Sequence, residues 1–173
     1  MSLFDYLDVE DALLVEAWIQ EVETEKYPLR KSLKEKARER FNDIKLKELG
    51  CGKKRIVFDL DNGWVLKIAI AFNGINNNQR EVEMYQSAPP RLQKRLAKIK
   101  EFGHGWLVMQ RITKPVPKKK GIKAEIKKII KQFERSGIIP GDLISPKRRI
   151  RWPNIRLRKG RIVVIDYGNF KWK

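Results

Sequence analysis

A strand that ends in a carboxylate constrains this sequence more than any other feature. Residues 161–165 are rich in β-branched side chains and predict a short buried strand. Asp166 follows this strand directly, and Gly168 allows the chain to turn sharply. A carboxylate at the end of a buried strand is costly unless it is paired, hydrogen-bonded or bound to a metal. Asp166 is therefore the first residue for which we expect a function.

The length and composition indicate a globular protein. A chain of 173 residues is long enough for one core or for two small lobes that share a cleft. Its single cysteine, Cys51, excludes an intramolecular disulfide and is typical of a reducing compartment. No signal peptide is visible at the N-terminus, and no apolar run approaches the roughly 18 residues of a membrane helix. We expect a cytoplasmic protein with no membrane contact, in the host cytoplasm if the small size reflects a phage origin.

The net charge of +18 is unevenly distributed. Residues 91–159 contain 22 Lys and Arg against four Asp and Glu, whereas residues 1–25 contain eight acids and no base. Such a field predicts an anionic partner, which could be a nucleic acid, a nucleotide, an acidic protein surface or the acidic N-terminus itself. The alternative is the solvated surface of a heat-adapted protein.

Hydrophobic periodicity predicts an α+β organisation. Residues 1–45 predict a helical extension, and residues 46–72 predict an antiparallel meander with a favoured Asn62-Gly63 hairpin turn. Lys67 is the single charged residue of the third strand, and a buried lysine needs an anionic partner. The further elements expected are helices at 9–23 and 31–42, a helix at 76–87 capped by Asn76, Asn77 or Asn78, a basic helix at 91–100, a strand at 106–110, a linker at 115–121 and an amphipathic helix at 121–135.

The order of these parts resembles the protein-kinase fold. A glycine turn precedes the apolar strand with Lys67, and a helix with Glu81 follows it. Asp142, Asn154 and the sequence Asp166-Tyr167-Gly168 come later in the order of the family's catalytic and metal-binding loops. The resemblance covers residues 46–170. It implies a small antiparallel-sheet N-lobe at 46–112 and a truncated helical C-lobe at 113–173.

The resemblance also implies a site for ATP and Mg²⁺. Asp142 and Lys67 would be catalytic: Asp142 would accept or orient the proton of an attacking hydroxyl, and Lys67 would hold the α- and β-phosphates. Asn154 and Asp166 would bind the metal. The cofactor-binding residues would be Gly50 and Gly52 at the phosphates, Glu81 orienting Lys67, and Val57, Met109, Gln110 and Ile112 around the adenine.

The sequence departs from the family pattern at several places. Arg55 stands where a third glycine is usual, and Pro140-Gly141 replaces His-Arg. The family spacing places the loop asparagine five residues after the aspartate, which is Lys147 here, so that Asn154 requires an insertion of seven residues. Because five residues follow Gly168, we expect the helices that bind a peptide substrate to be missing.

Two functions remain open from the sequence. The first is a minimal Mg-ATP-dependent phosphotransferase acting on a hydroxyl of a protein or small molecule. The second is an inactive kinase-like domain that binds nucleic acid or an acidic protein through residues 91–159, with 118–120 and 147–151 on phosphates and Trp152 stacking. Each signal alone also has a plainer interpretation. These are a solvent-facing edge-strand Lys67, a surface Glu81, an ordinary strand exit at 166–168 and a turn residue at His104.

Overall fold

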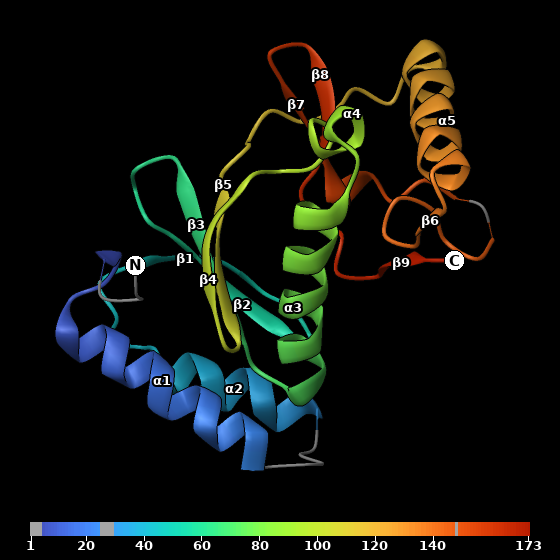
Figure 1. The fold of residues 1–173 in the computed structure, drawn as a ribbon. Coiled ribbons are helices and arrows are strands. Elements are labelled where there is room, and N and C mark those ends of the chain that lie inside the picture. The colour runs from blue at the N-terminus through green and yellow to red at the C-terminus, as the bar shows by residue number, and fades with distance from the viewer. Residues whose placement is uncertain (1–4, 25–29, 148) are drawn as a thin grey trace. The chain divides into compact units, whose positions relative to one another are not determined.

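The computed structural model describes residues 5–24, 30–147 and 149–173 (Figure 1). The chain divides into two compact units. The first unit comprises residues up to 79 together with 99–111, and the second comprises 80–98 together with 112–173. Helix α3 (Phe72–Ser87) contributes its first half to the first unit and its second half to the second. The lobe boundaries expected at residues 45 and 112 stay a prediction.

A five-stranded antiparallel sheet forms the centre of the first unit. Its strands are β1 (Lys47–Cys51), β2 (Arg55–Asp59), β3 (Trp64–Ala69), β4 (Ile99–Gly103) and β5 (Trp106–Gln110). They are arranged in the order β1-β2-β3-β5-β4, and every neighbouring pair is antiparallel. The predicted meander and the predicted strand at 106–110 are confirmed, and β3 lies in the middle of the sheet.

The turn between β2 and β3 differs from the predicted type. A two-residue Asn-Gly turn requires positive φ at both Asn62 and Gly63. The left-handed residues are instead Asp61, with φ of 57°, and Gly63, with φ of 85°. The Leu60 N–H donates to the Trp64 carbonyl at 3.1 Å. The loop therefore contains three residues rather than two.

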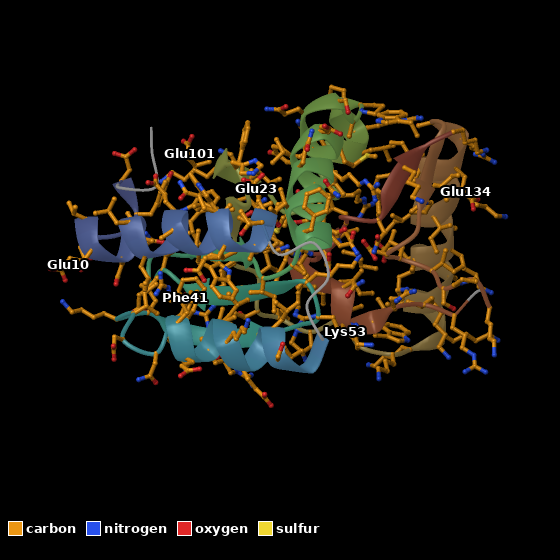
Figure 2. The ribbon with its side chains drawn as sticks, turned by 90° about the horizontal axis from the view of Figure 1, so that it is seen from below. Glu10, Glu23, Phe41, Lys53, Glu101 and Glu134 are labelled. Carbon is orange, nitrogen blue, oxygen red and sulfur yellow. The ribbon has the colours of Figure 1, made fainter. Side chains whose placement is uncertain are left out.

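Two N-terminal helices cover one face of this sheet (Figure 1). Asp8 directly precedes helix α1 (Val9–Thr24), and its carboxylate accepts the Asp11 N–H at 2.9 Å and caps the helix. Helix α2 (Arg30–Arg40) leads into Phe41, which Figure 2 shows between the two helices. The Phe41 ring makes edge contacts with Trp18 at 5.7 Å and with Phe58 of the sheet at 5.8 Å between ring centroids. The predicted helical extension is thus part of the core of the first unit.

The second unit is built from helical segments and two antiparallel strand pairs. Its elements are the second half of α3, the four-residue α4 (Pro90–Gln93), α5 (Lys120–Arg135), β6 (Ile138–Pro140), the 3₁₀ turn Trp152–Asn154, β7 (Ile155–Arg158), β8 (Arg161–Val164) and β9 (Phe170–Trp172). β6 pairs with β9, and β7 pairs with β8. Helix α5 buries the apolar stripe that its periodicity predicts and ends before Gly137, which has φ of 79°. No helix among the described residues is both long enough and apolar enough to cross a membrane.

The predicted basic helix at 91–100 is wrong. Helix α4 ends at Gln93, and β4 already begins at Ile99. Between them Leu96 forms a parallel bridge with Val164, and the Ala97 N–H donates to the Val164 carbonyl at 2.8 Å. Pairing with a strand far along the chain overrides the local helical pattern, which is a tertiary effect that periodicity does not report.

The predicted asparagine caps of α3 are also wrong. The helix begins at Phe72, so these asparagines lie in its interior. Asn77 accepts a hydrogen bond from Lys54 Nζ at 3.3 Å. Asn78 accepts one from Arg55 Nη1 at 3.1 Å and donates to the Gly105 carbonyl at 2.9 Å. Their side chains tie the helix to the sheet instead of starting the helix.

Candidate active site

Asp142 lies in the turn that follows β6. The preceding residue, Gly141, packs so closely on the backbone of Asn169 that a Cβ atom would lie 2.7 Å from the Asn169 carbonyl oxygen. A side chain therefore does not fit at position 141 without a backbone shift. This contact gives a local reason for a glycine where the family pattern has arginine, and it brings the Asp142 turn against the turn that follows Asp166.

The Asp142 carboxylate is buried, and each of its oxygens accepts one hydrogen bond from the same neighbour. The residue is 4% exposed. Its Oδ2 accepts the backbone N–H of Asn169 at 2.7 Å, and its Oδ1 accepts the Asn169 side-chain N–H at 2.9 Å. Burial raises the pKa of Asp142, the negative charges of Asp166 and Glu81 raise it further, and the two Asn169 bonds oppose this rise. The result is a carboxylate that is more basic than an ordinary aspartate.

Sequence reasoning missed Asn169. Its sole signal is an asparagine placed directly after Gly168, and asparagine is common in turns for many reasons. In the structure it holds both oxygens of Asp142 and so fixes the orientation of that carboxylate. We therefore add Asn169 to the candidate site as a positioning residue.

Asn154 joins the Asp142 loop to the end of β8. Its side-chain Nδ2 donates to the backbone carbonyl of Asp142 at 2.9 Å. Its own backbone carbonyl accepts the N–H of Ile165 at 2.8 Å, one residue before Asp166. In the described part of the chain no donor reaches the Asn154 Oδ1. The amide is thus oriented through its nitrogen, and its oxygen keeps its capacity to bind a ligand.

The inserted residues form a small hairpin. Ile144 and Ile150 form an antiparallel bridge, and the N–H of Ser145 donates to the Arg149 carbonyl at 2.9 Å. Directly outside this bridge, the N–H of Arg151 donates to the Leu143 carbonyl at 3.0 Å. Removal of residues 144–150 would leave the asparagine five residues after the aspartate, which is the family spacing.

The position that the family spacing selects, Lys147, lies in the exposed turn of this hairpin. Asn154 is the residue that reaches Asp142. The structure therefore places Asn154, and not Lys147, on the backbone carbonyl of Asp142, and the role of Asn154 as a metal ligand stays a prediction.

Glu81 is buried against the turn after Asp166. It is 0% exposed, so the interpretation as a surface glutamate is wrong. Its Oε1 accepts the backbone N–H of Tyr167 at 2.9 Å. The Tyr167 hydroxyl donates to the Ala97 carbonyl at 2.8 Å, and Tyr167 is itself fully buried. The turn is thus held on several sides, and Asp166, which is partly exposed, is presented from a fixed backbone.

Lys67 lies on the central strand of the sheet. Because β3 is central and Lys67 is 6% exposed, the interpretation as a solvent-facing edge lysine is wrong. The cross-strand partners of Lys67 are Val57 and Leu107, and Met109 lies two residues from Leu107 on the same face. This is the face opposite to the one that α1 and α2 cover. Val57, Lys67 and Met109 therefore share one surface of the sheet.

The remaining predicted nucleotide-binding residues are less closely grouped. Gln110 pairs with Trp64 and so lies on the helix-covered face, where its Oε1 is buried without a partner among the described residues. A Cβ on Gly50 would meet nothing within 4 Å, and one on Gly52 would meet no atom closer than 3.6 Å. Packing does not explain these glycines, which leaves open a close approach by a ligand. Ile112 is partly buried and belongs to the second unit.

The donor set of the second unit fits magnesium brought by a nucleotide. Among the described residues no group of three His, Cys, Asp or Glu side chains could hold a metal alone. Mg²⁺ in nucleotide sites takes one or two carboxylates together with phosphate oxygens and water. Asp166 and Asn154 offer such hard oxygen ligands, and the carboxylate charges that raise the pKa of Asp142 would be offset by a cation.

The elements that carry the candidate site residues follow one another along the chain in the predicted order. Strand β3 carries Lys67, the next helix, α3, carries the buried Glu81, and the loops of Asp142 and Asn154, which contact each other, precede the turn after Asp166. The order and connection of these parts resemble the protein-kinase fold. The resemblance is accompanied by a hairpin between Asp142 and Asn154 and by a helical layer on the sheet that belongs to the N-terminal extension.

No family model matches this chain, and no curated protein matches it significantly. Among solved structures it is similar to the bifunctional kinase-methyltransferase WbdD, with 15% identity and a TM-score of 0.45 over 70% of this chain and 31% of that one. It is also similar to APH(2'')-IIa in a ternary complex with streptomycin and ATP, with 14% identity and a TM-score of 0.46 over 84% of this chain and 74% of that one. The chain thus spans less than a third of the WbdD chain.

Proposed function

We propose that the protein is a Mg²⁺-dependent phosphotransferase that moves the γ-phosphoryl group of ATP to a hydroxyl. The observation that carries this proposal is the network around Asp142. Asn154 binds the backbone of Asp142, and Asn169 binds its carboxylate. A catalytic carboxylate, an amide oxygen and a strand-end carboxylate are thereby brought into one unit, and these are the groups that phosphoryl transfer requires.

Asp142 acts as the proton acceptor. A carboxylate oxygen offers two lone pairs, so each oxygen that accepts a bond from Asn169 retains one for the acceptor hydroxyl. The raised pKa makes the carboxylate a stronger base than an exposed aspartate. Asn169 keeps it in one orientation, so that the hydroxyl meets a fixed oxygen.

Asn154 and Asp166 would hold Mg²⁺, which would neutralise charge on the phosphates. Lys67 binds phosphate oxygens from the sheet, and Val57 and Met109 on the same face contact the adenine. The position of Lys67 favours this role, because it lies on the central strand and shares one face of the sheet with Val57 and Met109.

Thermal stability with Mg-ATP tests nucleotide binding. A ligand at about 100 times its Kd stabilises the folded state by about 2.7 kcal/mol, so the wild-type protein should show a clear rise in Tm at millimolar nucleotide. Lys67→Met and Asp166→Asn should lose the rise. Lys47→Met, which removes an exposed lysine of β1, should keep it. Absence of any rise in the wild-type protein would contradict the proposal.

A further inference from the structure

The segment between Asp142 and Asp166 is uniformly basic. It contains eight Lys and Arg and no Asp or Glu. It folds into the inserted hairpin at 144–150 and the β7–β8 hairpin at 155–164, joined by residues 151–154. We call residues 144–164 the double hairpin. Its exposed cations are Lys147, Arg149, Arg151, Arg158, Lys159 and Arg161.

These six cations differ from three arginines of the first unit. Arg38, Arg40 and Arg111 each pair with a carboxylate, at 2.8, 3.1 and 2.8 Å. Within the described residues, none of the six exposed cations of the double hairpin makes an ion pair. Unpaired and exposed cations at this density are available to an external polyanion.

The double hairpin is attached directly to the candidate catalytic loop. The inserted hairpin begins two residues after Asp142 and closes just before the 3₁₀ turn that carries Asn154. Three hydrogen bonds fix it. Two are the backbone Ser145–Arg149 and Arg151–Leu143 bonds given above, and in the third the Arg149 N–H donates to the side-chain Oγ of Ser145 at 3.1 Å. The hairpin and its cations are therefore fixed directly next to Asp142 along the chain.

Trp152 adds an aromatic surface between the two hairpins. It opens the 3₁₀ turn and is partly exposed. The ammonium of Lys118 lies 6.0 Å from the centre of its ring. A partly exposed indole beside cations is what proteins use to stack a base of a single strand while its phosphates are bound. The carboxylates of an acidic peptide would use the cations but would not stack on the ring.

The acidic N-terminal helix is engaged elsewhere. Glu21 pairs with Arg40 at 3.1 Å, and Glu23 lies 2.6 Å from His104 in the β4–β5 turn. Asp8 lies 3.9 Å from Lys45. All of these partners belong to the first unit. His104 is thus a turn residue, as predicted, and part of the acidic charge is used within the unit that carries it.

We propose that the double hairpin binds a single-stranded nucleic acid, and that this strand is the acceptor whose hydroxyl lies at Asp142. The second half rests on the proposed phosphotransferase function. In the transfer, the acceptor oxygen bonds to the γ-phosphorus, and the bond from that phosphorus to the β,γ-bridging oxygen of ATP breaks. ADP leaves, and the hydroxyl proton passes to the Asp142 carboxylate.

Binding is measured without nucleotide, by fluorescence anisotropy of a labelled oligothymidylate of about 20 nucleotides, which exceeds the footprint of one small binding module. Lys147→Glu with Arg149→Glu should weaken binding by about tenfold or more and lower its salt dependence, because phosphate contacts are lost. Lys123→Glu with Lys127→Glu makes the same charge change on the exposed face of α5 and serves as the matched control. Equal losses in the two double variants, or no binding by the wild-type protein, would overturn the proposal.

The aromatic part of the surface has its own comparison. Trp152→Ala should weaken binding by about tenfold, in the range of one lost stacking contact, whereas Trp172→Ala removes another exposed tryptophan, 47% exposed on β9, and should leave it unchanged. Poly-glutamate at equal charge should displace the oligonucleotide poorly. Displacement as efficient as that by unlabelled oligonucleotide would show that the surface recognises charge alone, and would overturn the assignment to nucleic acid.

Transfer of labelled γ-phosphate to the same oligonucleotide tests the acceptor. Label on the strand, lost in Asp142→Asn, supports the proposal. A protein that binds both Mg-ATP and the strand but labels no strand overturns the acceptor half, and the binding half stands. A protein without a Mg-ATP thermal shift contradicts the proposed function, whereas the anisotropy measurement decides the docking surface independently.

Discussion

The side-chain amide of Asn154 donates to the backbone carbonyl of Asp142 at 2.9 Å, although twelve residues separate the two positions. The bond forms because the intervening chain folds back on itself. The Ile144–Ile150 bridge and the Arg151–Leu143 hydrogen bond of 3.0 Å return it to its starting point. A long insertion therefore leaves the geometry of a short catalytic loop in place.

Deletion of residues 144–150 tests this interpretation. The bond between Leu143 and Arg151 shows that the two ends of the deletion are neighbours, so we expect the shortened protein to fold and to keep the Mg-ATP thermal shift. Its binding of single-stranded oligonucleotide should fall by about tenfold, as in the charge-reversed hairpin. Lys147→Gln with Arg149→Gln, which keeps the hairpin and removes its charge, is the control. Loss of the nucleotide shift in a folded deletion variant would contradict the positioning of Asn154.

Asp142→Asn should abolish transfer without loss of stability. The change removes the proton acceptor, and general base catalysis contributes about 10²–10⁴-fold to the rate. The Asn169 side-chain amide can rotate so that its oxygen faces the new amide nitrogen, which preserves the hydrogen bond. Transfer is measured with labelled ATP and stability by thermal unfolding. A variant with near wild-type transfer would remove Asp142 from the mechanism.

The difference in stability between Asp142→Asn and the wild-type protein should depend on pH. Burial raises the pKa of Asp142 in the folded protein above its ordinary value. Protonation of Asp142 therefore stabilises the folded protein. This stabilisation is fully present below the pKa that Asp142 has in the unfolded chain, and it is lost as the pH rises through the pKa that Asp142 has in the folded protein. At neutral pH the ionised carboxylate disfavours folding, so Asp142→Asn should unfold at the same or a higher temperature than the wild-type protein. At low pH the difference should disappear.

Asn169→Ala should move the acidic limb of the profile of transfer activity against pH to a higher pH. The Asn169 side-chain bond lowers the pKa of Asp142, so its removal lets the pKa rise further. Because Asp142 acts as a base only when it is ionised, the variant should lose transfer activity at a higher pH than the wild-type protein as the pH is lowered. At pH values above the acidic limb the transfer rate should change less. Asn62→Ala, in the exposed β2–β3 turn, is the control and should keep the wild-type profile. An unshifted limb would show that Asp142 does not set the profile.

The sequence was informative where a charged residue stands in or directly after an apolar segment. Lys67 in an apolar strand and Asp166 after one could be identified because buried charges need a reason, and both lie on described strands or strand ends. Asn169 could not be identified, because its importance comes from a contact with a turn 27 residues earlier. The prediction of a helix at 91–100 is wrong for the same reason, a contact between residues far apart in the sequence: Val164 pairs with Leu96.

Trp18→Ala should show that the N-terminal extension is part of the first unit's core. Trp18 is 4% exposed, packs on Phe41, and donates its indole N–H to the Ala69 carbonyl of β3 at 2.9 Å. Its truncation should lower the free energy of unfolding by about 3–5 kcal/mol, measured by urea denaturation. Leu13→Ala on the same helix removes a side chain that is 53% exposed and should change it by less than about 0.5 kcal/mol. Equal small effects would mean that α1 is a removable attachment, and the sheet would then have to be stable with this apolar face uncovered.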